Sequence, residues 1–112
     1  MSDIKELQEK VAQFISERDW EQFHSPKNIA MSIAIESAEL MEIFQWRTTQ
    51  DSLSPELIEK KRVDIEDEVA DIFIYLLSFI NVTNIDLYKA VIQKINRNHL
   101  RFPIEKVKGK FE

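Results

Sequence analysis

Apolar residues in the first part of the chain recur every three or four positions, which is the spacing of one helix face. The positions between Ile4 and Phe14 follow this pattern, so a first helix is predicted to run to about Arg18. A polar side chain just before such a stripe can cap the free backbone N–H groups of the first turn. Ser2 or Asp3 is expected to serve as this cap.

Two later helix starts are marked by a serine followed by a proline, at Ser25-Pro26 and Ser54-Pro55. The serine hydroxyl caps the helix, and proline suits the first helical position because the N–H it lacks would have no helical partner there. The apolar pattern then predicts a second helix over residues 26–47. It predicts a third over residues 55–82, either continuous or broken near residues 60–62.

The rest of the chain contains a link, a fourth helix and a tail. Residues 48–52 predict a polar connection. A fourth helix is predicted to begin at Asn84 or Asp86 and to stop before Pro103, because the residue preceding a proline avoids helical backbone angles. The tail, residues 103–112, is expected to be mobile.

Long amphipathic helices with short connections predict one all-α domain over residues 1–112, built as an antiparallel four-helix bundle. The single glycine, Gly109, leaves almost no residue for tight strand turns, which argues against a sheet. Helices two and three carry apolar residues on more than one side, for example Met31 and Ile74. Because a four-helix chain of this length cannot cover both, homo-oligomerisation is expected to complete the bundle.

Composition narrows the classes of partner. The 20 acidic residues outnumber the 15 basic ones and give a net charge of −5, which disfavours binding to a nucleic-acid polymer. There is no cysteine, so thiolate metal sites and cysteine nucleophiles are excluded. No apolar run is long enough to span a membrane, and the N-terminus does not resemble a signal peptide. A cytoplasmic location without membrane association is expected.

Two pairs of acidic residues stand within otherwise apolar helical stretches. Glu36 and Glu39 are three residues apart in the second helix, and Glu68 and Asp71 repeat that spacing in the third. Each pair leaves one helix face, and antiparallel neighbours can bring the two pairs together. Four carboxylates at close range repel one another unless a cation lies between them, and oxygen ligands favour a hard divalent cation.

Such pairs also arise by chance in a chain with 31 % charged residues, and most of them belong to a solvated helix face. The apolar neighbours of Glu36 and Asp71 favour a functional role here, because desolvating an unpaired carboxylate is costly. Other acids of the same helices fit an exposed outer face: Glu42, Asp64, Glu66 and Asp67.

Two further motifs accompany the four acids, Phe14-x-x-Glu-Arg-x-Trp20-x-x-Phe-His24-x-Pro-x-Asn28 and Glu39-Leu-x-Glu-x-Phe-Gln-Trp46. With these motifs and the spacing of the acids, the sequence resembles the MazG-like all-α nucleoside triphosphate pyrophosphohydrolases, and within them the dCTP-pyrophosphatase branch. This resemblance implies Mg²⁺-dependent cleavage of a (deoxy)nucleoside triphosphate, dCTP or a related one, into the monophosphate and pyrophosphate. It also implies assembly as a dimer or a dimer of dimers.

The resemblance implies roles for individual residues. Glu36, Glu39, Glu68 and Asp71 would bind Mg²⁺, with Mn²⁺ as a substitute. Further positions would bind the nucleotide: Trp20, His24, Trp46, Tyr75, Lys94 and Asn98. Among these, Lys94 is the phosphate candidate and Asn98 the base or sugar candidate. Phe102-Pro103 departs from the Tyr-Pro found in many relatives, which removes a hydroxyl.

Hydrolysis needs a water in line with the α or the β phosphorus, activated by a carboxylate, and Glu36 and Glu39 are the candidate bases. Without the resemblance, the aromatic residues would be read as core or interface side chains. The alternative function is a non-catalytic helical interaction module with a structural cation site.

Overall fold

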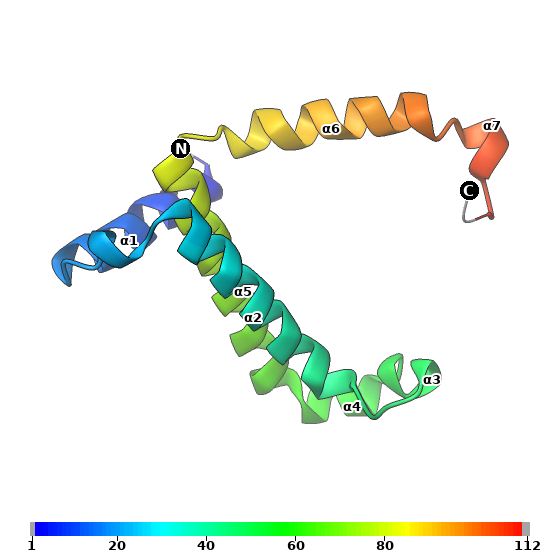
Figure 1. Ribbon diagram of the computed structural model, residues 1–112. Coiled ribbons are helices and arrows are strands. Elements are labelled where there is room, and N and C mark those ends of the chain that lie inside the picture. Colours follow the sequence, from blue (N-terminus) through cyan, green and yellow to red (C-terminus); the bar gives the residue numbers. More distant parts are fainter. Residues whose placement is uncertain (1, 111–112) are drawn as a thin grey trace.

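The computed structural model describes residues 2–110 as helices joined by short links, with no strand among these residues (Figure 1). The elements in chain order are α1 (Asp3–Glu17), the 3-10 helix η1 (Glu21–Phe23), α2 (Pro26–Phe44), α3 (Thr49–Ser52), α4 (Pro55–Lys60), α5 (Arg62–Thr83), α6 (Leu87–Arg101) and α7 (Ile104–Val107). The predicted all-α class is confirmed.

The serine caps lie where the sequence predicted them. The Ser25 hydroxyl accepts a hydrogen bond from the backbone N–H of Asn28 at 3.1 Å, and the Ser54 hydroxyl accepts one from Leu57 at 3.4 Å. Ser2, rather than Asp3, caps α1. Each hydroxyl pairs one of the N–H groups that a helix leaves free in its first turn.

Helix boundaries differ from the prediction in detail. The helix predicted over residues 55–82 is broken at Lys61 into α4 and α5, so of the two predicted alternatives the broken helix is the correct one. The second helix ends at Phe44, three residues before the predicted end at Arg47. The polar connection 48–52 contains a short helix, α3, because the Thr48 and Asp51 side chains form a reciprocal capping box.

The fourth predicted helix is α6, and Asp86 is its cap: its carboxylate accepts a hydrogen bond from the backbone N–H of Lys89 at 3.0 Å. The helix ends at Arg101, before Phe102-Pro103, as predicted. The short helix α7 lies within the tail expected to be mobile. Mobility of that tail stays a prediction, and residues 111 and 112 lie outside the described residues.

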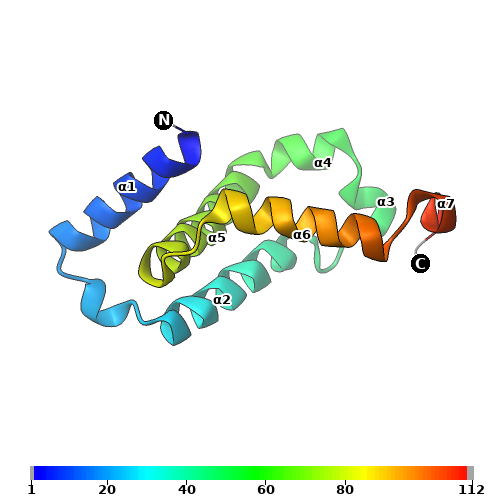
Figure 2. The same ribbon diagram turned by 90° about the horizontal axis from the view of Figure 1, so that it is seen from above.

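The helices α2 and α5 lie side by side and run in opposite directions, and α1 packs on the C-terminal half of α5 (Figures 1 and 2). Apolar side chains of α2 and α5 are buried between the helices, notably Ile29, Leu77 and Ile80. A polar pair also links α1 to α5. The Gln8 amide donates to the Asn81 side chain at 3.0 Å, and the Asn81 amide donates to the Gln8 backbone carbonyl at 3.1 Å.

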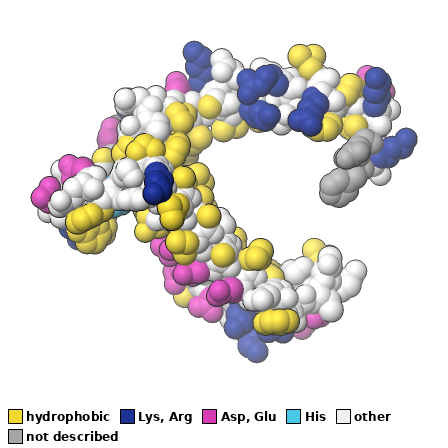
Figure 3. All heavy atoms as spheres, viewed as in Figure 1, with side chains coloured by type: hydrophobic (Ala, Val, Ile, Leu, Met, Phe, Trp, Pro, Cys, Tyr) yellow, Lys and Arg dark blue, Asp and Glu magenta, His cyan; other side chains and the backbone are white. Residues whose placement is uncertain are grey.

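The helix α6 projects away from this group, at 101° to α5 (Figure 1). The turn uses Asn84 in the left-handed region with φ of 57°, a conformation that asparagine tolerates better than most residues. The space-filling view has the outline of a letter C whose inner side carries many apolar side chains (Figure 3). Closure of the bundle by a second copy stays a prediction.

Within residues 2–110 no single helix is long and apolar enough to cross a membrane. Only α5 and α6 taken together across their bend pass that test.

Candidate functional site

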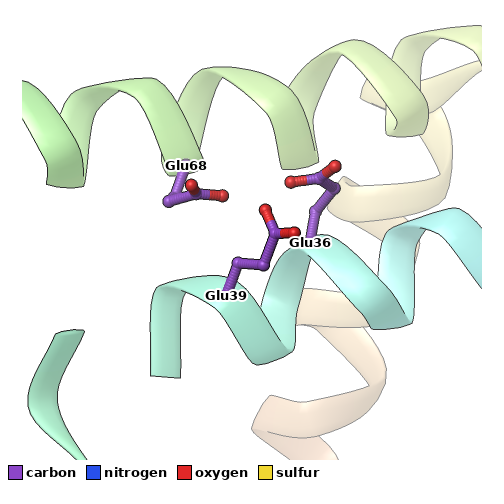
Figure 4. Close-up of side chains that lie close together, drawn as sticks. All are labelled: Glu36, Glu39 and Glu68. Carbon is purple, nitrogen blue, oxygen red and sulfur yellow. The ribbon is translucent and has the colours of Figure 1, made fainter. Parts of the chain in front are cut away.

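Three of the four predicted metal-binding acids meet between α2 and α5. Glu36 and Glu39 extend from α2 toward Glu68 on α5, as Figure 4 shows. One carboxylate oxygen from each residue lies within 4.8 Å of the corresponding atom of the other two. The antiparallel packing of two helices, each with an acid near the contact, therefore produces the cluster that the spacing predicted.

The cluster contains carboxylate oxygens that lack partners. Glu36 Oε2 and Glu68 Oε2 are both buried and form no hydrogen bond with any described residue. A buried oxygen of this kind costs free energy unless something positive or a proton donor approaches it. Three carboxylates at this separation, with no basic side chain of residues 2–110 in an ion pair to any of them, offer the all-oxygen donor set that a hard divalent cation prefers. The donor set thus fits such an ion.

The same crowding changes the acidity of two carboxyl groups. Hydrogen bonding with Glu39, then burial and the approach of Glu68, raises the pKa of Glu36 to about 7. Burial, followed by the approach of Glu39, also raises the pKa of Glu68 above its ordinary value. Part of the population of Glu36 therefore holds a proton near neutral pH, and a cation entering the cluster would displace it.

Asp71, the fourth predicted acid, lies one turn after Glu68 on α5. It is not part of the close three-glutamate cluster, yet its charge contributes to raising the pKa of both Glu36 and Glu68. Asp71 also lines a neighbouring pocket. It thereby stands between the acidic cluster and the apolar space beside it.

This pocket lies between α1 and α5 and has a volume of about 690 Å³. Trp20, His24 and Tyr75, three of the predicted nucleotide-binding residues, line it together with Asp71. Its remaining wall is mostly apolar and includes Phe14, whose ring meets the Trp20 ring edge-on at 5.9 Å between centroids. A partly aromatic pocket beside an acidic cluster can accept an aromatic ring that carries a phosphate chain.

The orientation of His24 follows from one contact. Its Nδ1 lies 2.7 Å from the Trp20 backbone carbonyl. Because a carbonyl only accepts hydrogen bonds, Nδ1 carries the proton that is donated to it, and Nε2 remains available to a ligand. This contact fixes the half-buried imidazole beside the Trp20 ring.

The structure does not bring the other three predicted nucleotide-binding residues to this pocket within one chain. Trp46 follows the end of α2 and is 88 % exposed, while Lys94 and Asn98 lie on the projecting helix α6. The acids assigned to a solvated face are all exposed, as predicted: Glu42, Asp64, Glu66 and Asp67.

The sequence interpretation missed two polar residues that line the pocket, Lys10 on α1 and Ser78 on α5. The signal for Ser78 was present, since it follows Asp71 and Tyr75 at helical spacings of seven and three residues. No comparable signal marked Lys10, whose position depends on how α1 packs against α5.

Comparison with known proteins gives consistent results. The family described as MazG-like matches residues 31–110. The chain is 36 % identical to dCTP pyrophosphatase 1 of Rattus norvegicus over 109 residues, which is 97 % of this chain and 62 % of that protein. For dCTP pyrophosphatase 1 of Homo sapiens the identity is 36 % over 103 residues, covering 92 % of this chain and 59 % of that protein. The chain thus spans about three fifths of the length of these relatives.

A solved structure shares the fold over nearly its whole length. It is a pyrophosphatase from Archaeoglobus fulgidus DSM 4304, with a TM-score of 0.85 and 38 % sequence identity. The match covers 92 % of this chain and 94 % of the other.

Proposed function

Because this chain belongs to the MazG-like family, we propose that it hydrolyses deoxynucleoside triphosphates to the monophosphate and pyrophosphate. The observation that carries the proposal is the three-glutamate cluster with two buried, unpaired oxygens, next to a pocket lined by Trp20, His24 and Tyr75. The glutamate cluster suits a cation together with phosphate groups, and the pocket suits the base of a nucleotide.

Glu36, Glu39, Glu68 and Asp71 are proposed to hold Mg²⁺, with Mn²⁺ as a substitute. When bound, the ion supplies positive charge that offsets the phosphate oxygens and makes nearby water more acidic. An acidic cluster alone would repel a triphosphate, so nucleotide and cation are expected to bind cooperatively.

The protein's own groups would position and activate the attacking water. Glu36 and Glu39 are the candidates to accept its proton. Glu39 is the exposed member of the cluster, whereas Glu36 and Glu68 each have an oxygen buried between the helices. This difference favours Glu39 as the base, because its carboxylate is the one that water and substrate reach.

The base of the nucleotide is proposed to lie in the aromatic pocket, where Trp20 and Tyr75 can contact its faces and His24 Nε2 can reach a polar atom. The substrate is proposed to be dCTP or a related deoxynucleotide, as the names of the rat and human relatives suggest.

We also propose that the chain forms an oligomer. The chain leaves many large apolar side chains exposed on α5 and α6, including Val69, Leu76, Val91 and Ile95. A dimer or a dimer of dimers would cover them, and could bring Trp46, Lys94 and Asn98 of a second copy to the open pocket.

Product analysis tests the proposal. Purified protein is incubated with each of the four deoxynucleoside triphosphates, with Mg²⁺ and with a chelator, and the products are separated by anion exchange. The proposal expects monophosphate and pyrophosphate, only with the cation. Orthophosphate and diphosphate as products would contradict it, and no turnover would favour the alternative of a helical interaction module with a structural cation.

A further inference from the structure

One polar group beside the pocket has no role in the proposed chemistry, namely the hydroxyl of Ser78 on α5. Ser78 is 2 % exposed, and its Oγ is buried without a hydrogen-bond partner among the described residues. Ser78 and Leu77 are the most buried side chains that line the pocket. Ser78 therefore lies at an enclosed part of the mostly apolar lining, and its hydroxyl is covered in the empty pocket.

A serine or threonine within a helix commonly pairs its hydroxyl with the carbonyl four residues earlier. Thr83, on the same helix, does so: its Oγ1 donates to the Phe79 carbonyl at 2.7 Å. Ser78 makes no such bond, so both its donor and its acceptor capacity remain unused. Since buried polar groups are nearly always paired, an unpaired one on a residue that lines a pocket points to a ligand, which the hydroxyl would reach by rotation about the Cα–Cβ bond.

The position of Ser78 along α5 indicates which part of a nucleotide it would meet. Asp71, Tyr75 and Ser78 share one face of the helix, and Ser78 lies about 10 Å along the axis from Asp71. The acidic cluster lies at the other end of this row, so phosphates and cation belong there. The ring of the base is the part that suits the apolar surroundings of Ser78, such as Val11 and Leu77.

We propose that the Ser78 hydroxyl forms a hydrogen bond with a polar edge atom of a pyrimidine base in this pocket, and so helps to select the base. This inference rests on the proposed function in one respect, the presence of a nucleotide in the pocket. A pyrimidine presents ring nitrogen and exocyclic oxygen atoms on its edge, and a hydroxyl can donate to these or accept from an amino group. A purine has a second ring, so different edge atoms would lie near the Ser78 hydroxyl.

The test compares Ser78→Ala with Thr83→Val, a matched control that removes a paired hydroxyl outside the pocket. Steady-state kinetics with dCTP and dATP give the selectivity, and thermal unfolding in metal-free buffer gives the stability. For Ser78→Ala we expect the ratio of kcat/KM for dCTP over dATP to fall by about 3- to 10-fold, the equivalent of one neutral hydrogen bond. Its Tm should be unchanged or higher, because an unpaired buried hydroxyl is removed. Thr83→Val should lower the Tm and leave the ratio unchanged.

Other results would overturn the inference. An unchanged ratio in Ser78→Ala means that the hydroxyl does not contact the base. An equal loss with both nucleotides together with a lower Tm means that Ser78 serves packing only.

A second measurement separates this inference from the proposed function. Titration of the metal-free protein with 2′-deoxycytidine, which has no phosphate, requires neither hydrolysis nor the cation. If the wild-type protein releases no pyrophosphate but binds the nucleoside more tightly than Ser78→Ala does, the proposed function fails and the role of Ser78 stands. If wild type and variant bind the nucleoside equally, or neither binds it, the role of Ser78 fails.

Discussion

Without a cation, burial and the crowding of carboxyl groups between α2 and α5 raise the pKa of Glu36 and of Glu68. The pKa of Glu36 is raised to about 7 from an ordinary value of 4.5. Between these two values the folded state binds more protons than the unfolded chain, so raising the pH through this window removes stability. The raised pKa of Glu68 acts in the same direction.

We therefore expect the Tm of the chelator-treated protein to fall as the pH rises from about 4.5 to above 7, and Mg²⁺ to restore it at the upper end. Glu36→Gln should flatten this pH dependence, because it removes the group with the raised pKa. Differential scanning calorimetry at several pH values measures the effect. The same pH dependence in wild type and Glu36→Gln would show that the cluster is not its source.

Trp20 offers the residue-scale test of the pocket. Its ring is 43 % exposed and lines the pocket opposite α5. Trp20→Ala should raise KM for all four deoxynucleotides by the equivalent of a stacking contact, about 1–3 kcal/mol, since stacking acts on any base. Initial-rate kinetics across the four substrates measure this. A change in kcat with KM unaltered would place the base elsewhere.

For single residues, the sequence was enough to predict the acidic cluster, but it was not enough to predict all the residues that line the pocket. The three-residue spacing within α2 and within α5 placed Glu36, Glu39 and Glu68 on facing sides, and short-range helical geometry was enough for that. The unpaired state of the Ser78 hydroxyl depends on the surrounding packing, which spacing alone does not describe. The burial of Glu36 Oε2 and Glu68 Oε2 likewise required the packed helices.

At the scale of elements, helix starts were predictable because a cap is a local interaction. Ser25-Pro26 and Ser54-Pro55 begin helices where the sequence placed them, and Asp86 is the one of the two predicted caps, Asn84 or Asp86, that begins α6. The short helix α3 was missed, since its capping box between Thr48 and Asp51 occupies a stretch too short for an apolar period. The angle between α5 and α6 was not predictable either, because it depends on the backbone of a few residues around Asn84.

The link between α1 and α5 gives an element-scale prediction. Asn81 exchanges two hydrogen bonds with Gln8 and holds α1, which carries part of the pocket wall, against α5. Asn81→Ala should destabilise the fold by about 1–3 kcal/mol, because it leaves partly buried groups of Gln8 unpaired. It should also raise KM more than it lowers kcat. Urea denaturation and kinetics measure both, and a stability loss with normal KM would show that α1 does not position the pocket.

At the scale of the whole molecule, α2 and α5 pack together with α1, while α6 extends away from them with apolar residues such as Val91 and Ile95 exposed. The sequence predicted that a second copy would be needed, because two helices were apolar on several sides. We expect light scattering to give a dimer or tetramer, and a stable monomer of 13.3 kDa would contradict this.

If α6 of one copy completes the pocket of another, two inactive variants should restore each other. Glu39→Gln removes a proposed carboxylate of the acidic cluster, and Lys94→Ala removes the proposed phosphate contact on α6. Mixed and reassembled, they should recover up to about a quarter of wild-type activity, since half of random dimers are mixed and each has one intact site. If each site is formed by a single chain, mixing restores nothing.

The carboxylates between α2 and α5 are proposed to carry out the pyrophosphohydrolysis. The most direct measurement is pyrophosphate release from dCTP with Mg²⁺ by wild type, Glu39→Gln and Glu66→Gln, the last being an exposed acid of α5 outside the cluster. We expect Glu39→Gln to lower kcat by about 100-fold or more, with the Tm in metal-free buffer unchanged or higher, and Glu66→Gln to retain activity. Equal losses in the two variants, or full activity in Glu39→Gln, would show that the cluster is not the catalytic site.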